Sequence, residues 1–250
     1  MPARAVIFDL GHTLWDFVPD LNLRRISILR MHARLLDALG EAPSPRKLDS
    51  ALHNSTTRMM ERWSNDYDDL TQPATSVLVR DALQALEVSV EDDVLRELTA
   101  AVFGRDVEMP FIEPDSLAAL GELDGRGLSL ACVTNTILLD IGIRDVLERL
   151  GLHRYIRHAV VSSAAGYRKP HGSLFLQAAA ALGCSPHEAV FVGDRLRDDI
   201  AGAKAVGMRA VLTHQYRQEP IESARVAPDA VIERLGELPG LLEAWSRVDG

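Results

Sequence analysis

The chain has 250 residues, of which 47% are hydrophobic and 25% are charged, a composition typical of a folded protein with a substantial core. Its formal net charge of -9 excludes a whole-protein field that attracts nucleic acid or anionic lipid, so any phosphate ligand must be bound by local groups. No apolar run reaches the roughly 18 residues of a membrane span, and no secretory signal pattern opens the chain. We therefore expect a cytoplasmic protein with no membrane or nucleic-acid partner, whose two cysteines, Cys132 and Cys184, are free structural thiols.

Short apolar runs recur along the chain and predict buried strands. The first is AVIF at residues 5–8, and the others lie at 128–133, 158–162, 189–192 and 209–213. Such continuous runs suit parallel strands that are covered on both faces. Helix-period segments separate most of them, at 114–127, 138–152, 171–183 and 198–208, and a short edge strand with a closing helix is expected within 228–245. This alternation predicts a doubly wound, Rossmann-like α/β fold with a parallel sheet.

A long helical stretch interrupts the alternation after the first strand. Between Leu21 and Asp106 the apolar spacing predicts helices over 21–40, 44–63, 75–86 and 89–104, with Ser44 and Ser89 as start signals. We therefore predict an α/β core domain made of residues 1–18 and 108–250, with an all-helical cap domain at 19–107. Within the cap, Met59, Met60 and Trp63 are expected to form part of its own core. Trp15 and Phe17, at the entrance to the cap, are expected to pack cap against core.

Polar residues follow the predicted strands where each one ends. Asp9 ends the first run, Thr134 and Asn135 end the second, Lys169 lies shortly after the third, and Asp194 follows the fourth. Because ligands of open parallel sheets bind outside the carboxyl ends of the strands, we expect these side chains to converge. Carboxylates suit Mg²⁺, while an ammonium and a hydroxyl suit phosphoryl oxygens, and a carboxylate can attack phosphorus. The set predicts phosphoryl chemistry on a small phosphorylated metabolite.

Four motifs carry a family resemblance. They are DLGHT at 9–13, VTN at 133–135, RKP at 168–170 and GDRLRDD at 193–199, in that order and at strand ends. With them the chain resembles the haloacid dehalogenase superfamily, specifically its phosphatase-like members with a helical, C1-type cap between the first and second motifs. The resemblance covers roughly residues 3–20 and 110–240. It implies a Mg²⁺-dependent phosphatase that works through an aspartyl-phosphate.

The resemblance also implies a role for each matching residue. Asp9 would be the nucleophile and a Mg²⁺ ligand, with the backbone carbonyl of Gly11 as a second ligand. Thr134 and the backbone of Asn135 would bind the phosphoryl group, and Lys169 would balance charge. The remaining motif supplies Asp194 as the third metal ligand and Asp199 to orient metal-bound waters or Lys169, with Asp198 as the alternative for that job.

Gly11 departs from the family pattern. Family members that hydrolyse phosphate esters usually carry an aspartate there, which protonates the leaving group and then activates water. A general acid contributes on the order of 10²–10⁴ in rate, so its loss is expected to slow or restrict a phosphatase rather than abolish it. His12 is a candidate stand-in for the acid and a candidate substrate contact. Two other functions stay open: a metal-independent 2-haloacid dehalogenase, and a phosphate-binding regulatory protein that has lost turnover.

Overall fold

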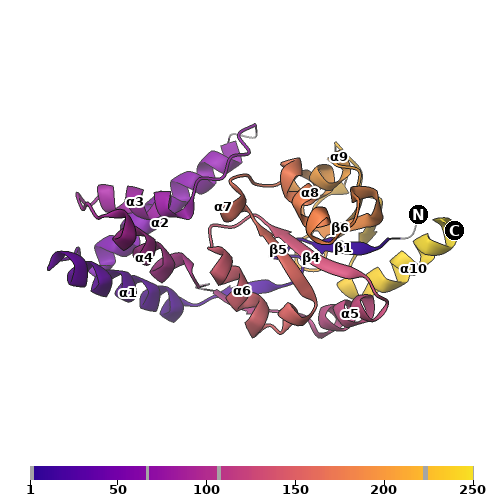
Figure 1. Cartoon of the computed structure of the whole chain (residues 1–250), viewed down its shortest axis with the longest axis horizontal. Helices are drawn as coiled ribbons and strands as arrows, with labels where there is room; N and C mark the ends of the chain where they lie inside the picture. Colours follow the sequence, from indigo (N-terminus) through magenta and orange to yellow (C-terminus); the bar gives the residue numbers. More distant parts are fainter. Residues whose placement is uncertain (1–2, 66–67, 106–107, 222–224, 250) are drawn as a thin grey trace.

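The computed structural model describes residues 3–65, 68–105, 108–221 and 225–249. A helical group of α1, α2, α3 and α4 lies on one side, and a sheet flanked by further helices lies on the other (Figure 1). Both ends of the described chain belong to the sheet side. The first strand and the described residues of 108–221 and 225–249 therefore build one part of the molecule, with the helical group inserted between them.

The main sheet has six parallel strands in the order β5-β4-β1-β6-β7-β8. Their bounds are β1 Ala5–Phe8, β4 Ser129–Thr134, β5 Ile156–Val161, β6 Ala189–Gly193, β7 Arg209–Thr213 and β8 Ala230–Ile232. Each predicted strand is present within two residues of its expected position. The strand order reverses on either side of β1, which is the arrangement of a doubly wound sheet, and the predicted fold class is confirmed.

Each face of the sheet is covered by helices because successive side chains of a strand point to opposite faces. Val6 and Phe8 of β1 pack into one apolar cluster, and Ala5 and Ile7 pack into another. The first cluster is closed by α5 (Pro114–Gly125), α6 (Asp140–Arg149) and α10 (Leu238–Asp249), and the second by α8 (Gly172–Ala181) and α9 (Gly202–Ala205). All four β1 residues are at most 1% exposed, so β1 is held rigidly at the centre of the sheet.

The helical insert has its own hydrophobic core. Its helices are α1 Leu21–Leu39, α2 Pro45–Asn65, α3 Thr75–Gln84 and α4 Asp92–Phe103. Asp20 caps α1 by accepting hydrogen bonds from the N–H groups of Asn22 and Leu23, and α1 ends at Gly40, whose φ of 76° suits glycine. The predicted start signal at Ser89 is wrong, because α4 begins at Asp92 with Glu91 in the N-cap position.

Two of the residues assigned to the core of the insert behave differently from the prediction. Met59 is 7% exposed and belongs to that core, but its neighbour Met60 is 43% exposed. Adjacent residues of a helix point about 100° apart, so both cannot face the same core. Trp63 packs only partly against the core and carries the guanidinium of Arg168 over its ring, 5.5 Å from the centre.

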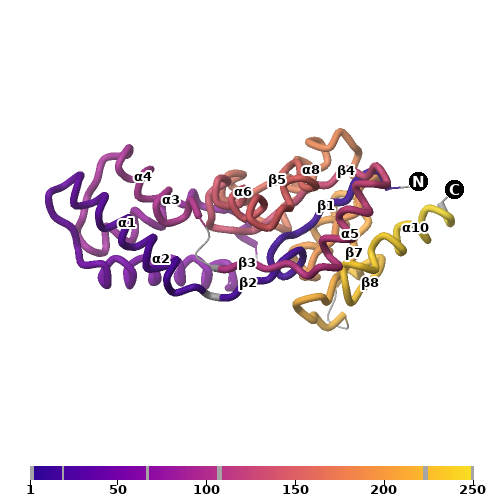
Figure 2. The backbone as a smooth tube through the Cα atoms, turned by 90° about the horizontal axis from the view of Figure 1, so that it is seen from below, coloured from indigo at the N-terminus to yellow at the C-terminus, as the bar shows by residue number. Residues whose placement is uncertain are grey.

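Contacts at several places join the insert to the sheet domain, and the two-stranded ribbon among them can be followed in Figure 2. The first is an antiparallel ribbon of β2 (Asp16–Pro19) and β3 (Glu108–Phe111), which the sequence did not predict because four-residue segments with a proline in each show no strand pattern. The second joins the loop after α2 to the loop before Lys169: the N–H of Gln72 donates to Gly166 at 2.9 Å, and that of Arg168 donates to Leu70 at 2.9 Å. A third joins α3 and α4 to the loop after β4: the Thr75 hydroxyl donates to Ile137 at 3.0 Å, and the N–H of Leu139 donates to Phe103 at 2.9 Å. The insert is therefore held at several separate points. The predicted cap boundary at residue 107 lies outside the described residues.

Both cysteines are free, and Cys132 is buried in β4. Burial raises the pKa of its thiol. Among the described helices, none combines the length and the apolar character that crossing a bilayer requires.

Candidate active site

The first site residue, Asp9, directly follows the central strand β1. Its backbone N–H donates to Val192 of β6 at 2.8 Å, so the strand pairing itself fixes where the carboxylate begins. Residues 10–15 then form a tight turn in which the N–H of His12 donates to the carbonyl of Trp15 at 2.7 Å. The turn brings the Thr13 hydroxyl back to the carboxylates, where it lies 3.3 Å from Asp9 Oδ2 and 3.5 Å from Asp194 Oδ1. Asp9 is 7% exposed and keeps access to the cavity beside it.

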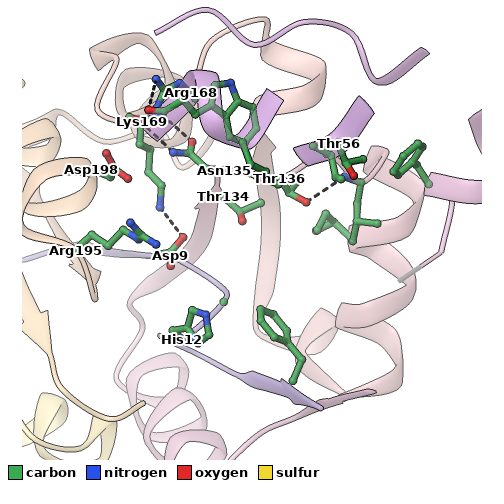
Figure 3. Close-up of a pocket in the computed structure, with 18 of the residues that line it drawn as sticks. Asp9, His12, Thr56, Thr134, Asn135, Thr136, Arg168, Lys169, Arg195 and Asp198 are labelled. Atoms are coloured by element: carbon green, nitrogen blue, oxygen red, sulfur yellow. Dashed lines mark hydrogen bonds and ion pairs between the residues drawn. The ribbon is translucent and has the colours of Figure 1, made fainter. Parts of the chain in front are cut away.

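Lys169 joins two of the carboxylates. Its Nζ points toward Asp9 (Figure 3) and lies 2.5 Å from Asp9 Oδ1. The same Nζ lies 2.6 Å from Asp199 Oδ1, and Lys169 is 2% exposed. Burial alone would lower the pKa of Lys169, but the charges of Asp199 and Asp9 outweigh it, and the pKa lies above its ordinary value. Lys169 is therefore a fixed ammonium at neutral pH and compensates two buried acids.

Asn135 holds the backbone of this lysine. Its Oδ1 accepts from the N–H of Lys169 at 2.7 Å, and its Nδ2 donates to the Lys169 carbonyl at 3.1 Å. Both the oxygen and the nitrogen of the Asn135 side chain therefore form hydrogen bonds with Lys169. A contact between Asn135 and a phosphoryl group would thus come from the Asn135 backbone. Thr134, the last residue of β4, is 5% exposed and lines the same cavity.

Two of the three acids of the fourth motif belong to the cluster: Asp194 directly follows β6, and Asp199 lies in the helical segment Leu196–Ala201. Asp194 and Asp199 are 2% and 1% exposed, and Asp199 Oδ2 accepts from the backbone N–H of Arg195 at 2.9 Å. Gly193 permits this arrangement, because a Cβ there would lie 2.4 Å from the Cβ of Asp199. Asp198 is placed differently: it faces Arg197 at 3.8 Å, with its side chain 15% exposed.

Crowding of acids shifts their protonation. Burial, together with the charges of Asp9 and Asp199, raises the pKa of Asp194 to about 8. Burial also raises the pKa of Asp199 to about 7, although the nearby Lys169 pulls it down. The cluster thus carries more negative charge than the surrounding protein compensates.

The same cluster fits a divalent cation. One oxygen from each of Asp9, Asp194 and Asp199 lies within 4.8 Å of the others, and all three residues are buried. Among the described residues, Asp194 Oδ2 is buried yet accepts no hydrogen bond; Arg217 faces it as an ion pair at 3.3 Å. Three buried carboxylates, one with an oxygen that accepts no hydrogen bond, form a donor set that suits Mg²⁺.

The position of the missing acid is covered by an aromatic ring. A Cβ on Gly11 would lie 3.0 Å from Cζ of Phe17, so this ring occupies the space next to the glycine. His12 lies beside it, with a φ of 59°, its ring edge-on to Phe17 at 5.1 Å and its Nδ1 2.9 Å from Asp16 Oδ1. Of the two imidazole nitrogens, Nε2 is the one left for a substrate.

A cavity of about 680 Å³ opens beside the carboxylates, between the sheet domain and the insert. Asp9, Thr134, Asn135, Lys169, Asp194 and Asp199 all line it, and so do Gly11, His12 and Asp198. The residues that the sequence singled out from separate motifs therefore share one site.

Sequence reasoning missed three contributors to this site. Thr13 is the last residue of the first motif, so its position in DLGHT was an available signal. Arg168 is the first residue of the RKP motif, so it had a signal too, although its bond to the carbonyl of Asp69 in the insert at 2.8 Å could not be foreseen. Arg217 had none, because it acts from the loop after β7. Such contacts join segments far apart in the chain.

Comparison with known proteins agrees with this geometry. The model of the haloacid dehalogenase-like hydrolase family matches residues 3–207. The chain belongs to this family. A glyceraldehyde 3-phosphate phosphatase of Methanothermobacter thermautotrophicus is 33% identical over 86% of this chain and 88% of its own length. A phosphoglycolate phosphatase of Escherichia coli is 30% identical over 94% of this chain and 90% of its own.

A solved structure of similar shape has a different reaction in its name. The 2-haloacid dehalogenase of Pseudomonas syringae pv. Tomato superposes with a TM-score of 0.67, is 29% identical, and covers 97% of this chain and 99% of its own. The chain is thus a hydrolase of a family whose named relatives cleave either phosphate esters or carbon–halogen bonds.

Proposed function

We propose that the protein is a Mg²⁺-dependent phosphatase that acts on a small phosphorylated metabolite through a phosphoaspartate at Asp9. The observation that carries the proposal is the buried cluster of Asp9, Asp194 and Asp199. A reaction at carbon needs one carboxylate, whereas three converging carboxylates suit a cation that binds phosphate. The names of the two relatives support the same class of substrate.

The proposed roles follow from position. Asp9, the carbonyl of Gly11, Asp194 and Asp199 would hold the cation, which when bound neutralises phosphate charge and orients substrate oxygens. Thr134, Lys169 and the backbone of Asn135 would bind the phosphoryl group. The helical insert, residues 19–107, would act as a cap that excludes water from the cavity.

The reaction has two steps on Asp9. An oxygen of its carboxylate forms a bond to phosphorus while the bond from phosphorus to the leaving oxygen breaks, and that oxygen takes a proton for which His12 Nε2 is the proposed donor. A water then returns a proton to His12 and adds to phosphorus, and the bond between Asp9 and phosphorus breaks to release phosphate. Lys169 holds the nucleophile in place and neutralises it throughout.

A second candidate is hydrolysis of a short 2-haloacid, in which Asp9 would attack carbon without a metal. The likeness to the dehalogenase structure and the absence of an acid at Gly11 favour it. A third candidate, phosphate binding without turnover, is favoured by Gly11 alone. The three buried acids rank the dehalogenase below the phosphatase, whereas the third candidate would keep them and differ only in turnover.

One assay panel separates the three. We expect purified protein with Mg²⁺ to hydrolyse a chromogenic phosphate, and Asp9→Asn to remove the activity while the far-UV circular dichroism stays unchanged. Halide release from a chloroacid in the presence of a chelator would identify the second candidate. Phosphate binding without turnover on any phosphate ester would identify the third.

A further inference from the structure

We propose that the organic part of the substrate is uncharged, bulky and apolar, such as an alcohol that carries an aromatic or branched hydrocarbon group. This inference rests on the proposed phosphatase function and specifies its substrate class. The two named relatives act on small polar phosphates, so the inference separates this chain from them.

The first observation concerns the wall next to the nucleophile. The ring of Phe17 lies over Gly11, two residues after Asp9, and would be 3.0 Å from a Cβ there. Phe17 lines the cavity, and Trp15 from the same turn does so as well. The first atoms of the leaving group therefore meet an aromatic surface where related phosphatases present a carboxylate.

The second observation concerns the facing wall, which the insert supplies. Ile28 of α1 and Leu52, Met60 and Trp63 of α2 line the cavity, and Phe103 at the end of α4 joins them. Met60 is 43% exposed although it is apolar, and it points into the cleft rather than into the core of the insert. An apolar side chain left exposed in a concave site gains free energy when an apolar ligand covers it.

The third observation is that two charged side chains of this wall, Arg24 and Asp49, pair with each other. Among the described residues that line the cavity, the insert supplies one arginine, Arg24, and its Nε lies 2.7 Å from Asp49 Oδ1. The hydroxyl of Thr56 donates within its own helix, 3.0 Å from the carbonyl of Leu52. The Arg24–Asp49 pair does not favour a carboxylate or a second phosphate on the part of the substrate that contacts the insert, whereas Arg195 and Arg217 line the cavity from the sheet domain, beside the carboxylates.

The fourth observation is size. A cavity of about 680 Å³ lies within the usual range for drug-sized ligands, roughly 300–1,000 Å³. A phosphoryl group bound at Asp9 fills a small part of this space. The remainder accommodates a ring, and the apolar walls on both sides make a ring the favoured occupant.

The test uses phosphate monoesters of primary alcohols, which differ in bulk and in charge while the type of ester bond stays the same. We expect kcat/KM for 2-phenylethyl phosphate and cyclohexylmethyl phosphate to exceed that for ethyl phosphate at least about tenfold, since a single methylene in an apolar pocket is already worth roughly 10–200-fold. Phosphoglycolate is expected to react no faster than ethyl phosphate.

A pair of variants locates the effect. Met60→Glu places a charge in the apolar wall and is expected to reduce the ratio of kcat/KM for 2-phenylethyl phosphate over ethyl phosphate to near one. Met109→Glu is the matched control, because Met109 is 50% exposed on β3 and is not among the residues that line the cavity. It is expected to leave the ratio as in the parent protein.

The outcomes separate this inference from the proposed function. If the esters are hydrolysed at equal efficiency, or phosphoglycolate is preferred, the substrate class is wrong and the phosphatase stands. If Met109→Glu lowers the ratio as much as Met60→Glu, the apolar wall is not its cause. If no phosphate ester is hydrolysed with Mg²⁺, the phosphatase itself is wrong and the inference falls with it.

Discussion

Asp198 and Asp199 are neighbours in the chain, yet their surroundings differ completely. Asp199 contacts Lys169 and the backbone of Arg195 and is 1% exposed, whereas Asp198 faces Arg197 near the cavity edge. We expect Asp199→Asn to lower kcat with Mg²⁺ by at least about 10²-fold, because it weakens both the metal site and the lysine contact. Asp198→Asn, the matched control, is expected to stay within about threefold of the parent. Equal losses in steady-state assays would contradict the assignment of Asp199.

The role of His12 can be tested with a substitution that preserves its backbone conformation. Its φ of 59° lies in the left-handed region, which asparagine adopts more readily than most residues. We expect His12→Asn to preserve the fold and to lower kcat by about 10²-fold, the usual contribution of a positioned acid. An unchanged kcat, with unchanged circular dichroism, would remove His12 from the proposed mechanism.

At the scale of elements, the Asp199 side chain lies so close to the backbone at the end of β6 that only glycine fits at position 193. Alanine at Gly193 would place a Cβ 2.4 Å from the Cβ of Asp199 and push that carboxylate out of the cluster. We expect Gly193→Ala to lower the free energy of unfolding by about 1–3 kcal/mol and to weaken Mg²⁺ binding. Gly125, at the end of α5, has no neighbouring atom within 4 Å of such a Cβ. Gly125→Ala is therefore the control, and urea unfolding that shows equal losses would contradict the clash.

Some of the helices and strands could be predicted from the sequence, and others could not. The strands were predictable because a strand buried on both faces must be a continuous apolar run, as AVIF and AVFV are. The ribbon of β2 and β3 was not predictable, because its two four-residue strands are about 90 residues apart in the chain and neither shows a strand pattern of its own. Likewise, the exposure of Met60 depends on where α2 sits relative to the sheet domain, which its helical spacing does not specify.

At the scale of the whole molecule, Mg²⁺, protons and folding are linked. Because the pKa values of Asp194 and Asp199 are raised to about 8 and about 7, the metal-free folded protein holds protons that the unfolded chain releases near pH 4. The stability of the metal-free protein is therefore expected to fall as the pH rises from about 4 through 8. Mg²⁺ needs the deprotonated acids, so its affinity is expected to rise over the same upper range.

Thermal unfolding checks this linkage directly. We expect Mg²⁺ to raise Tm more at pH 8.5 than at pH 6, and a chelator to remove the difference. At a concentration about 100 times Kd the stabilisation is about 2.7 kcal/mol, which corresponds to several degrees for a chain of this size. Ca²⁺ at the same concentration is the comparison ion. A Tm that ignores Mg²⁺ at both pH values would contradict a metal site.

The sequence alone determined that acids, a lysine and a hydroxyl meet at one sheet edge, because the carboxyl ends of parallel strands share that edge whatever else surrounds them. The tertiary structure alone decided what lies around that edge: Phe17 over Gly11, the Asp16 partner of His12, and Arg217 beside Asp194. The positions of the strands along the chain follow from local apolar patterns, whereas these contacts depend on how side chains from distant segments pack, and no local pattern encodes that packing.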